Sequence, residues 1–183
     1  LPGVSKGKPL DKHGQRPLPQ GEVFFDEVRV PAKYAIAADD AAIPQMNATL
    51  TFANMEMSAT FTGVARSAFD LALDYVHERK QGGTPIINHQ SVQIRTFDLW
   101  QRVEAARALV YQAARHVDSG AKDISRISAM CKLFASDVAM RVTTDAVQLF
   151  GGYGYMKEYP VEKMMRDAKI TQIYEGTNQI QRE

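Results

Sequence analysis

Apolar residues recur at gaps of three and four over most of this chain, and this spacing limits the possible fold more than any other feature. Between about residue 45 and residue 80 the repeat includes Met57, Phe61, Val64, Ala68, Leu71 and Tyr75. Two later segments continue it, with Phe97, Trp100, Val103, Ala106, Val110, Ala113 and Val117, then with Ile127, Met130, Phe134, Val138, Val142 and Leu149. Residues three and four apart share one face of an α-helix, so each segment is predicted to be a helix with an apolar stripe.

Glycine and proline indicate where these helices begin and end. The first helix is predicted to run to Lys80 and stop at Gly82-Gly83, the second to end before Gly120, and the third to close at Gly151-Gly152. A shorter fourth helix is predicted to begin at Pro160, because the missing N–H of proline has no partner in the first helical turn. Burying the stripes against each other predicts an all-α fold, an antiparallel four-helix bundle.

The first forty residues do not follow this helical period. Residues 1–20 carry Gly, Pro, Lys and Asp without an apolar repeat, which predicts an extended connection. Residues 23–30 are rich in β-branched and aromatic side chains between Gly21 and Pro31, which predicts a strand or two. A lone hairpin is marginally stable, so we expect this short β/extended segment to belong to a sheet whose other strands lie outside the chain.

Composition excludes several classes of function. The 183 residues are 45% hydrophobic, which favours a packed core over disorder. Their 22 basic and 21 acidic residues are interspersed, so no basic stripe is available for nucleic acid. No apolar stretch approaches the roughly 20 residues that span a bilayer, and we expect a soluble, non-secreted protein. The single cysteine, Cys131, is predicted to be a buried structural thiol, and the scattered histidines predict no metal site.

The most informative chemistry lies in residues 173–182, near the end of the chain. Glu175 stands between Tyr174, which could supply an apolar wall, and Gly176, whose backbone could approach a substrate closely. Thr177, Asn178 and Gln179 are suited to cap a helix beginning there, and a helix N-terminus is also a seat for phosphate oxygens. On the residues alone, a solvated loop carboxylate and simple capping remain open alternatives to a site.

Three segments in one order resemble the acyl-CoA dehydrogenases, flavoenzymes that desaturate acyl-CoA thioesters. They are Ile173-Tyr174-Glu175-Gly176-Thr177-Asn178-Gln179-Ile180-Gln181-Arg182, the run Gln148–Tyr155, and the run Tyr159–Ile170. Asp26–Pro31 is similar to the segment that ends the middle β-domain of this family. The resemblance therefore implies that residues 1–40 are a remnant of that domain and its linker. Residues 41–183 would be the C-terminal helical-bundle domain, with its last helix truncated.

The resemblance assigns roles to the residues of the last segment. Glu175 would be the base that takes the α-proton of the thioester while the β-hydrogen leaves as hydride to FAD. Tyr174 and Gly176 would line the substrate site. Thr177 and Gln179 occupy positions through which members of the family contact FAD.

A second set of residues would contact FAD across a subunit interface. By resemblance, Gln148 and Gly152 lie against the adenosine diphosphate part of FAD bound mainly to a neighbouring subunit. Arg79 and Gln90 belong to a stretch, Glu78–Gln90, that reaches the same cofactor. From the residues alone, a helix C-cap would explain the glycines, and positive charge at a helix C-terminus would explain Arg79.

The chain departs from the family pattern at two positions. Gly82 stands where most members have an aromatic residue, and Asn54 where many have an arginine near the substrate. The leading expectation is an FAD-dependent dehydrogenase of fatty acid metabolism, a homodimer or homotetramer that passes electrons to an electron-transfer flavoprotein in a bacterial cytoplasm or a mitochondrial matrix. The two departures keep open a non-catalytic helical binding or oligomerisation module. An acyl-CoA oxidase is the third alternative.

Overall fold

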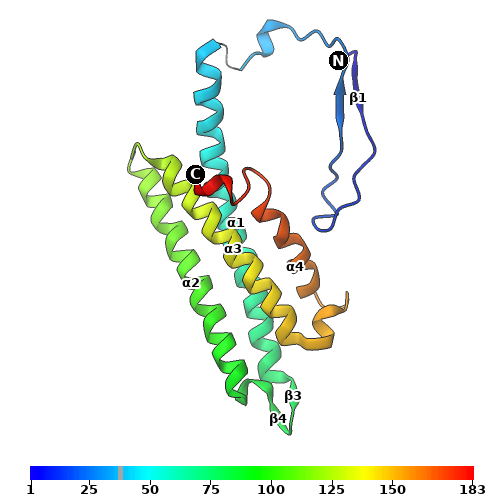
Figure 1. Ribbon diagram of the computed structural model, residues 1–183, viewed down its shortest axis with the longest axis vertical. Helices are drawn as coiled ribbons and strands as arrows, with labels where there is room; N and C mark the ends of the chain where they lie inside the picture. Colours follow the sequence, from blue (N-terminus) through cyan, green and yellow to red (C-terminus); the bar gives the residue numbers. More distant parts are fainter. Residues whose placement is uncertain (37–38) are drawn as a thin grey trace.

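The computed structural model describes residues 1–36 and 39–183 and consists mainly of four α-helices. These are α1 (Ala42–Glu78), α2 (Gln90–Asp118), α3 (Ile124–Phe150) and α4 (Val161–Lys169). Consecutive helices run in opposite directions, the three long ones lie side by side, and α4 packs against α3 and α1 (Figure 1). This arrangement confirms the predicted all-α fold, an antiparallel four-helix bundle.

Short strands and 3₁₀ helices complete the chain. The strands are β1 (Val4–Lys6), β2 (Val23–Phe25), β3 (Lys80–Gln81) and β4 (Thr84–Pro85). The 3₁₀ helices are η1 (Ala32–Tyr34), η2 (Asp39–Ala41), η3 (Ile86–Asn88), η4 (Gly151–Tyr155), η5 (Ile170–Gln172) and η6 (Ile180–Arg182). None of the helices in the described ranges is long and apolar enough to cross a membrane.

The helix ends agree with the sequence at α3 and differ from it at α1. Helix α3 ends at Phe150, and its C-cap residue Gly151 has a φ of 61°, which glycine adopts at little energetic cost. Helix α1 ends at Glu78, earlier than predicted, because β3 and β4 pair as an antiparallel hairpin around Gly82 and Gly83. Both glycines have positive φ, as a tight two-residue hairpin turn requires. Helix α4 begins at Val161, one position after the predicted start, and Pro160 is its N-cap residue.

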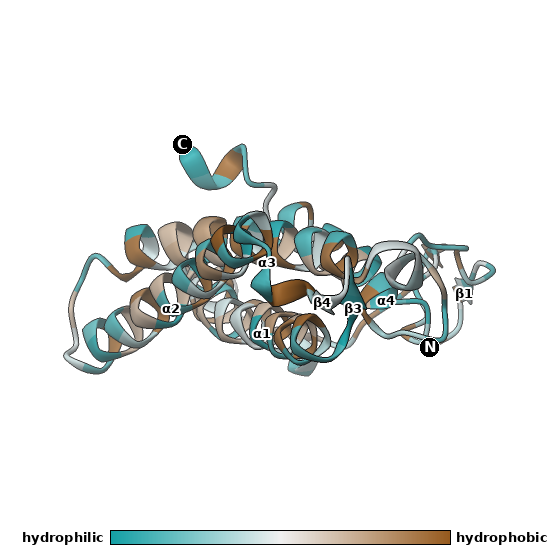
Figure 2. Ribbon diagram, turned by 90° about the horizontal axis from the view of Figure 1, so that it is seen from below, coloured by the Kyte–Doolittle hydropathy of each residue, from teal (hydrophilic) through white to brown (hydrophobic). Residues whose placement is uncertain are grey.

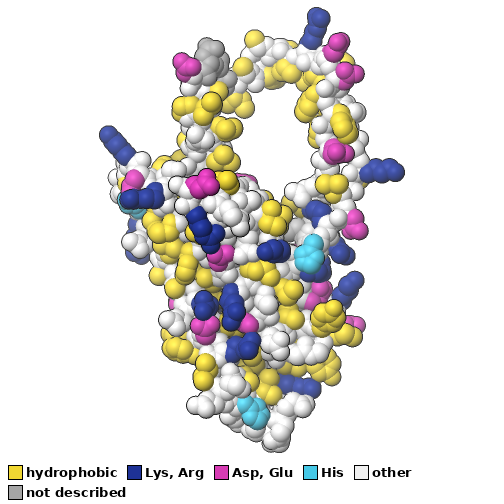
Figure 3. All heavy atoms as spheres, in the orientation of Figure 1, with side chains coloured by type: hydrophobic (Ala, Val, Ile, Leu, Met, Phe, Trp, Pro, Cys, Tyr) yellow, Lys and Arg dark blue, Asp and Glu magenta, His cyan; other side chains and the backbone are white. Residues whose placement is uncertain are grey.

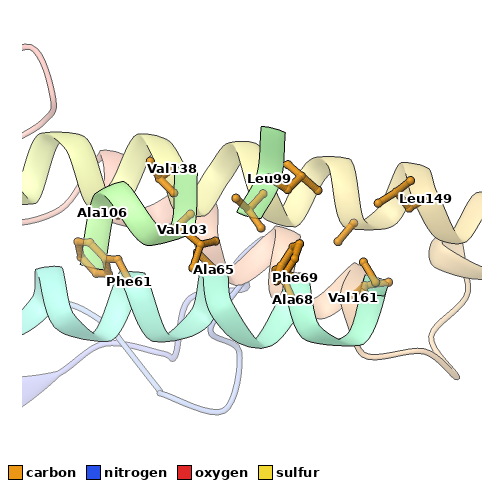
Figure 4. Close-up of a cluster of buried hydrophobic side chains, with 14 of the residues drawn as sticks. Phe61, Ala65, Ala68, Phe69, Leu99, Val103, Ala106, Val138, Leu149 and Val161 are labelled. Atoms are coloured by element: carbon orange, nitrogen blue, oxygen red, sulfur yellow. The ribbon is translucent and has the colours of Figure 1, made fainter. Parts of the chain in front are cut away.

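The core lies where α1, α2 and α3 face each other, with α4 closing one side (Figure 4). Its buried residues include Phe61, Ala65, Ala68, Phe69, Leu99, Val103, Ala106, Val138, Leu149 and Val161. Alanines recur on the facing sides of α1 and α3, and such small side chains let two helices approach closely. Each long helix also carries hydrophilic residues along its length, as the hydropathy colours show (Figure 2). The α1–α3 pair makes the most extensive contact in the bundle.

The apolar stripe predicted for α2 is wrong at its beginning. Phe97 and Trp100 are 60% and 46% exposed, whereas Leu99, absent from the predicted stripe, is fully buried. A repeated gap of three turns the face of a helix by about 60° per step, so Phe97 lies on the opposite side from Ala106. The two exposed rings contact each other instead, with centroids 5.7 Å apart.

The N-terminal segment forms a hairpin that extends beyond the bundle. Strand β1 pairs antiparallel with β2, with Val4 opposite Phe25. A strand at β1 was not expected, and β2 is shorter than predicted. All six strand residues are exposed, so neither face of the pair is covered within this chain. In the space-filling view, hydrophobic side chains lie on this segment and on the upper half of α1, around an open space (Figure 3).

Residues 13–15 fasten this segment to the bundle. A Cβ added to Gly14 would lie 2.2 Å from the carbonyl oxygen of Arg166, so this backbone approaches α4 at a distance that needs glycine. The guanidinium of Arg166 donates to the carbonyl oxygen of His13 at 3.1 Å. The N-terminal segment is therefore held beside α4 and close to the turn that follows it.

Candidate active site

Glu175 lies in the turn between η5 and η6, with its backbone in the left-handed region. Its φ is 50°, and Gly176 follows with a φ of 89°. The left-handed region costs an L-residue roughly 1 to 2 kcal/mol, so the surroundings must hold Glu175 in place. Gly176 cannot be replaced easily, because L side chains are strained at its positive φ; an added Cβ would also displace the end of the Gln181 side chain. The side chain of Glu175 is exposed in this chain.

A buried lysine of α3 holds the turn from the side of the bundle. The Nζ of Lys132 donates to the carbonyl oxygen of Gly176 at 2.6 Å and to Oδ1 of Asn178 at 3.0 Å. Lys132 is 0% exposed. Burial lowers the pKa of Lys132, and the nearby carboxylates of Asp137 and Glu175 act in the opposite direction. An ammonium in such a place needs acceptors, and the turn supplies both of them.

Asn178 connects the turn to two further side chains of α3. Its Nδ2 donates to Oγ of Ser136 at 2.9 Å and to Oδ1 of Asp137 at 2.8 Å. The same Oδ1 accepts a hydrogen bond from Nε2 of Gln172 at 2.6 Å. Asn178 itself is buried. The polar groups that fix this turn thus come from one face of α3 and form a connected network.

Tyr174 anchors the other side of the turn. It is half-buried, and its ring lies 6.0 Å from the ring of Phe61 on α1. Burial raises the pKa of Tyr174, a hydrogen bond with Gln15 lowers it, and the charge of Glu175 raises it further. Tyr174 therefore joins the core on one side and the N-terminal segment on the other.

The predicted helix cap after Glu175 is replaced by a weaker arrangement. The Oγ1 of Thr177 accepts a hydrogen bond from the backbone N–H of Ile180 at 3.4 Å, while Gln179 is exposed and makes no capping bond. The element that follows, η6, is a three-residue 3₁₀ helix. Asn178, predicted to cap, points its side chain into the network of α3 instead.

Arg79 and Gly152 line a cavity of about 480 Å³ at the C-terminal end of α1. The guanidinium carbon of Arg79 lies 5.1 Å from the ring centroid of Tyr153, and the rings of Tyr75 and Phe150 stack at 4.1 Å. A Cβ added to Gly152 would meet nothing within 4 Å. The cavity therefore combines a cation, open backbone and aromatic walls.

The structure separates the predicted residues into two groups. Phe61 of α1 lies beside Tyr174, and Glu78 at the end of α1 directly precedes Arg79. At 1.5 Å per residue, these two positions on α1 are roughly 25 Å apart. Gln90 at the start of α2 and Gln148 near the end of α3 are exposed and do not line the cavity of Arg79. Glu175, Thr177 and Gln179 form one group, and Arg79 with Gly152 forms the other.

Asn54 lines a cavity together with Gln181, the residue that donates to the carbonyl oxygen of Glu175. It is buried on α1, and its Oδ1 has no hydrogen-bond partner among the described residues. Within residues 1–36 and 39–183, no three side chains of His, Cys, Asp or Glu are grouped to hold a metal ion.

Comparison with known proteins identifies the family. The family model of the acyl-CoA dehydrogenase C-terminal domain matches residues 43–183. A probable acyl-CoA dehydrogenase (fadE25) of Mycobacterium leprae is 48% identical over 180 residues, which cover 98% of this chain and 46% of that protein. The chain belongs to the acyl-CoA dehydrogenase family.

Solved structures give the same result. The butyryl-CoA dehydrogenase of Megasphaera elsdenii superposes with a TM-score of 0.93 at 44% identity, covering 98% of this chain and 47% of that one. A chain in a structure described as the electron transferring flavoprotein of Acidaminococcus fermentans reaches 0.94 at 44% identity, covering 100% and 48%. This acyl-CoA dehydrogenase chain thus spans about half the length of the relatives it matches.

Sequence reasoning missed the residues that hold the turn in this family member. Lys132, Ser136 and Asp137 were not among the predicted site residues. A signal for them was present, because Ser128, Lys132 and Ser136 follow at intervals of four within an otherwise apolar face of α3. Polar side chains that recur on the buried face of a helix need partners, and here most of these partners belong to the turn of Glu175.

Proposed function

We propose that this chain is the C-terminal helical half of an FAD-dependent acyl-CoA dehydrogenase and that Glu175 is its catalytic base. The observation that carries the proposal is the turn itself. A carboxylate-bearing residue in a left-handed conformation is followed by a backbone carbonyl and an asparagine oxygen that both accept hydrogen bonds from a buried lysine. Backbone strain of this kind persists where the surroundings over-determine it, and it is frequent at functional sites.

The chemistry requires a base held close to a weakly acidic carbon. The α-carbon of a thioester gives up its proton only when the base is well positioned and fixed donors stabilise the developing negative charge. Glu175 would take that proton, and the rigid backbone of Gly176 would allow the thioester to come close. Bound FAD would accept the β-hydrogen as hydride. Tyr174 would support the site from the side of the core.

The two groups of residues suit two different FAD molecules. The cavity beside Arg79 fits the diphosphate of a cofactor, because a guanidinium pairs with phosphate oxygens and Gly152 leaves the backbone open. Thr177 and Gln179 lie next to Glu175, in the turn beside the middle of α1. We infer a homodimer or homotetramer in which each subunit offers Thr177 and Gln179 to its own FAD. Arg79, Gly152, Gln90 and Gln148 would then serve the FAD of a neighbour.

The exposed hairpin supports the assignment of residues 1–40 to a middle β-domain. Phe24 and Phe25 of β2 are 50% and 72% exposed, and large apolar side chains also lie bare on the first turns of α1, at Ile43, Met46, Leu50 and Phe52. Exposed apolar surface of this extent is typical of a contact with another domain or subunit. Residues 41–183 would form the helical-bundle domain. The 183-residue chain alone would bind FAD poorly and be inactive.

The proposal includes an electron acceptor for the full-length enzyme. The structural match to a chain from a structure of an electron transferring flavoprotein supports such a protein as the partner of the full-length enzyme. Relatives with different acyl groups in their names leave the acyl chain of this substrate open. The compartment stays a prediction, a bacterial cytoplasm or a mitochondrial matrix, and the relatives that match are bacterial.

The test replaces Glu175 by Gln in the full-length protein and mixes it with acyl-CoA in the absence of oxygen. Loss of a general base costs about 10² to 10⁴-fold in rate, so the flavin absorbance of Glu175→Gln should bleach at least about 100 times more slowly. Glu158→Gln, an exposed glutamate outside the turn, is the matched control and should bleach at the wild-type rate.

Three other results would reject the proposal or redirect it. Normal bleaching of Glu175→Gln would remove Glu175 from the chemistry. A colourless wild-type protein would favour a non-catalytic helical module instead. Stoichiometric hydrogen peroxide on admission of air during turnover would favour an acyl-CoA oxidase.

A further inference from the structure

The carbonyl groups on both sides of Gly176 are held by side chains from different parts of the chain. The carbonyl oxygen of Glu175 accepts a hydrogen bond from Nε2 of Gln181 at 3.2 Å. The carbonyl oxygen of Gly176 accepts one from Nζ of Lys132 at 2.6 Å. Together these bonds fix the orientation of the peptide groups on both sides of Gly176, the residue most able to rotate. The backbone of Glu175 is thereby clamped on its C-terminal side.

Lys132 is the stronger of the two clamps. Its side chain is fully buried, so its ammonium depends on the acceptors that the turn supplies. Its second acceptor, Oδ1 of Asn178, belongs to the same turn. Asn178 is in turn fixed by Ser136 and Asp137 on α3. Charge-assisted hydrogen bonds are about twice as strong as neutral ones, and they are shorter, as the contact to Gly176 is.

We propose that Lys132 is a positioning residue that sets the direction of the Glu175 carboxylate by holding the carbonyl of Gly176. This inference rests on the proposed role of Glu175. Lys132 does not touch substrate or cofactor in the proposal, because it lies beneath the turn on the side of the bundle. It acts by keeping the strained backbone of Glu175 in one conformation, so that the carboxylate meets the α-carbon without rearrangement.

The test replaces Lys132 by Met, which keeps the length of the side chain and removes the donor. The full-length holoenzyme is mixed with acyl-CoA without oxygen, and the rate constant of flavin reduction is measured per bound flavin. A misplacement of about 1 Å can cost on the order of 100-fold, so Lys132→Met should reduce its flavin about 10 to 100 times more slowly. The substrate concentration at half-maximal rate should change less than about threefold.

Substrate deuterated at the α-carbon separates positioning from loss of stability. Proton removal would become the slow step in Lys132→Met, so the deuterium isotope effect on flavin reduction should rise above that of the wild type. The control is Val142→Ala, which removes a fully buried side chain of α3 away from the turn. It should lower the unfolding temperature and leave the rate per bound flavin and the isotope effect unchanged.

If Lys132→Met does not fold, Gln181→Ala is the variant that tests the inference. Gln181 is at the surface side of the turn, and its loss removes the second clamp, which should slow flavin reduction several-fold. Wild-type rates in either variant would overturn the inference. One outcome separates the two proposals: the flavin bleaches normally in the wild type and in Lys132→Met but not in Glu175→Gln. In that case only the proposed role of Lys132 fails. If Glu175→Gln bleaches normally, the proposed function itself fails.

Discussion

Cys131 shows how burial alone changes the chemistry of a side chain. It is 0% exposed, and its Sγ donates to the carbonyl oxygen of Leu109 at 3.7 Å. Burial raises the pKa of Cys131 to about 11. The thiol therefore stays protonated at neutral and moderately alkaline pH, as expected for the buried structural cysteine that the sequence predicts.

Alkylation of this single cysteine tests the burial of α3. At pH 8 the thiolate fraction of Cys131 should be on the order of 100-fold smaller than that of an exposed cysteine, because its pKa is raised. Iodoacetamide should therefore modify the folded chain at least about 100 times more slowly than the urea-unfolded chain, and the rate should rise as the pH approaches 11. Equal rates in folded and unfolded chains would show that α3 does not bury this thiol.

At the residue scale, the sequence predicted the burial of Cys131 but not the burial of Lys132. Cys131 belongs to a recognisable apolar pattern, whereas a lysine is ordinarily assigned to solvent. The acceptors that make the burial of Lys132 possible stand 44 and 46 positions away, in Gly176 and Asn178. No local rule connects such positions. The hydrogen bonds of Glu175 and its left-handed φ were beyond sequence reasoning for the same reason.

At the scale of single elements, the predicted and observed faces differ at the beginning of α2 and also in α3, where Met130 and Phe134 of the predicted stripe are 44% and 39% exposed. The sequence placed Phe97 and Trp100 in the stripe because large apolar residues at gaps of three resemble a helical face. In α2 the structure buries Leu99 in their place, and it also buries Val103, Ala106 and Ala113 of the predicted stripe. Smaller side chains fit the closely packed side, and the two bulky rings remain outside. The existence of α2, its period and the burial of Val103, Ala106 and Ala113 were predicted correctly, but the buried side at its beginning was not.

Two substitutions in α2 distinguish these faces. Leu99→Ala removes a fully buried side chain and should lower the free energy of unfolding by about 2 to 4 kcal/mol. Phe97→Ala removes an exposed ring and its contact with Trp100, and should cost about 1 kcal/mol or less. Urea unfolding of the 183-residue chain, followed by circular dichroism, measures both. A larger loss for Phe97→Ala than for Leu99→Ala would support the stripe predicted from sequence.

At the scale of the whole molecule, the sequence was sufficient to predict the bundle. It did not predict that the candidate site residues separate into two groups. The helical period, the glycine stops and the proline before α4 were sufficient for an antiparallel four-helix bundle. The turn of Glu175 lies beside the middle of α1 and Arg79 follows its C-terminal end, and this placement depends on how α3 and the last turn pack back onto α1. Large exposed side chains such as Phe25 and Met46 further indicate surfaces that this chain does not cover by itself.

The proposed role of Glu175 would divide between this chain and the rest of the full-length assembly. The bundle fixes the turn through Lys132 and Tyr174, while the side chain of Glu175 remains exposed to solvent. Exclusion of water and the binding of thioester and flavin would depend on the remaining half of the subunit and on its neighbour. The central claim is therefore a claim about proton removal by Glu175 in the full-length assembly.

Deuterium incorporation from D₂O tests this claim most directly, because it reports removal of the α-proton without requiring transfer of electrons. Acyl-CoA is incubated without oxygen with the full-length protein, and the recovered thioester is examined by mass spectrometry. We expect the wild type to introduce deuterium at the α-carbon, and Glu175→Gln to do so about 10² to 10⁴-fold more slowly. Exchange by Glu175→Gln at the wild-type rate would contradict the account.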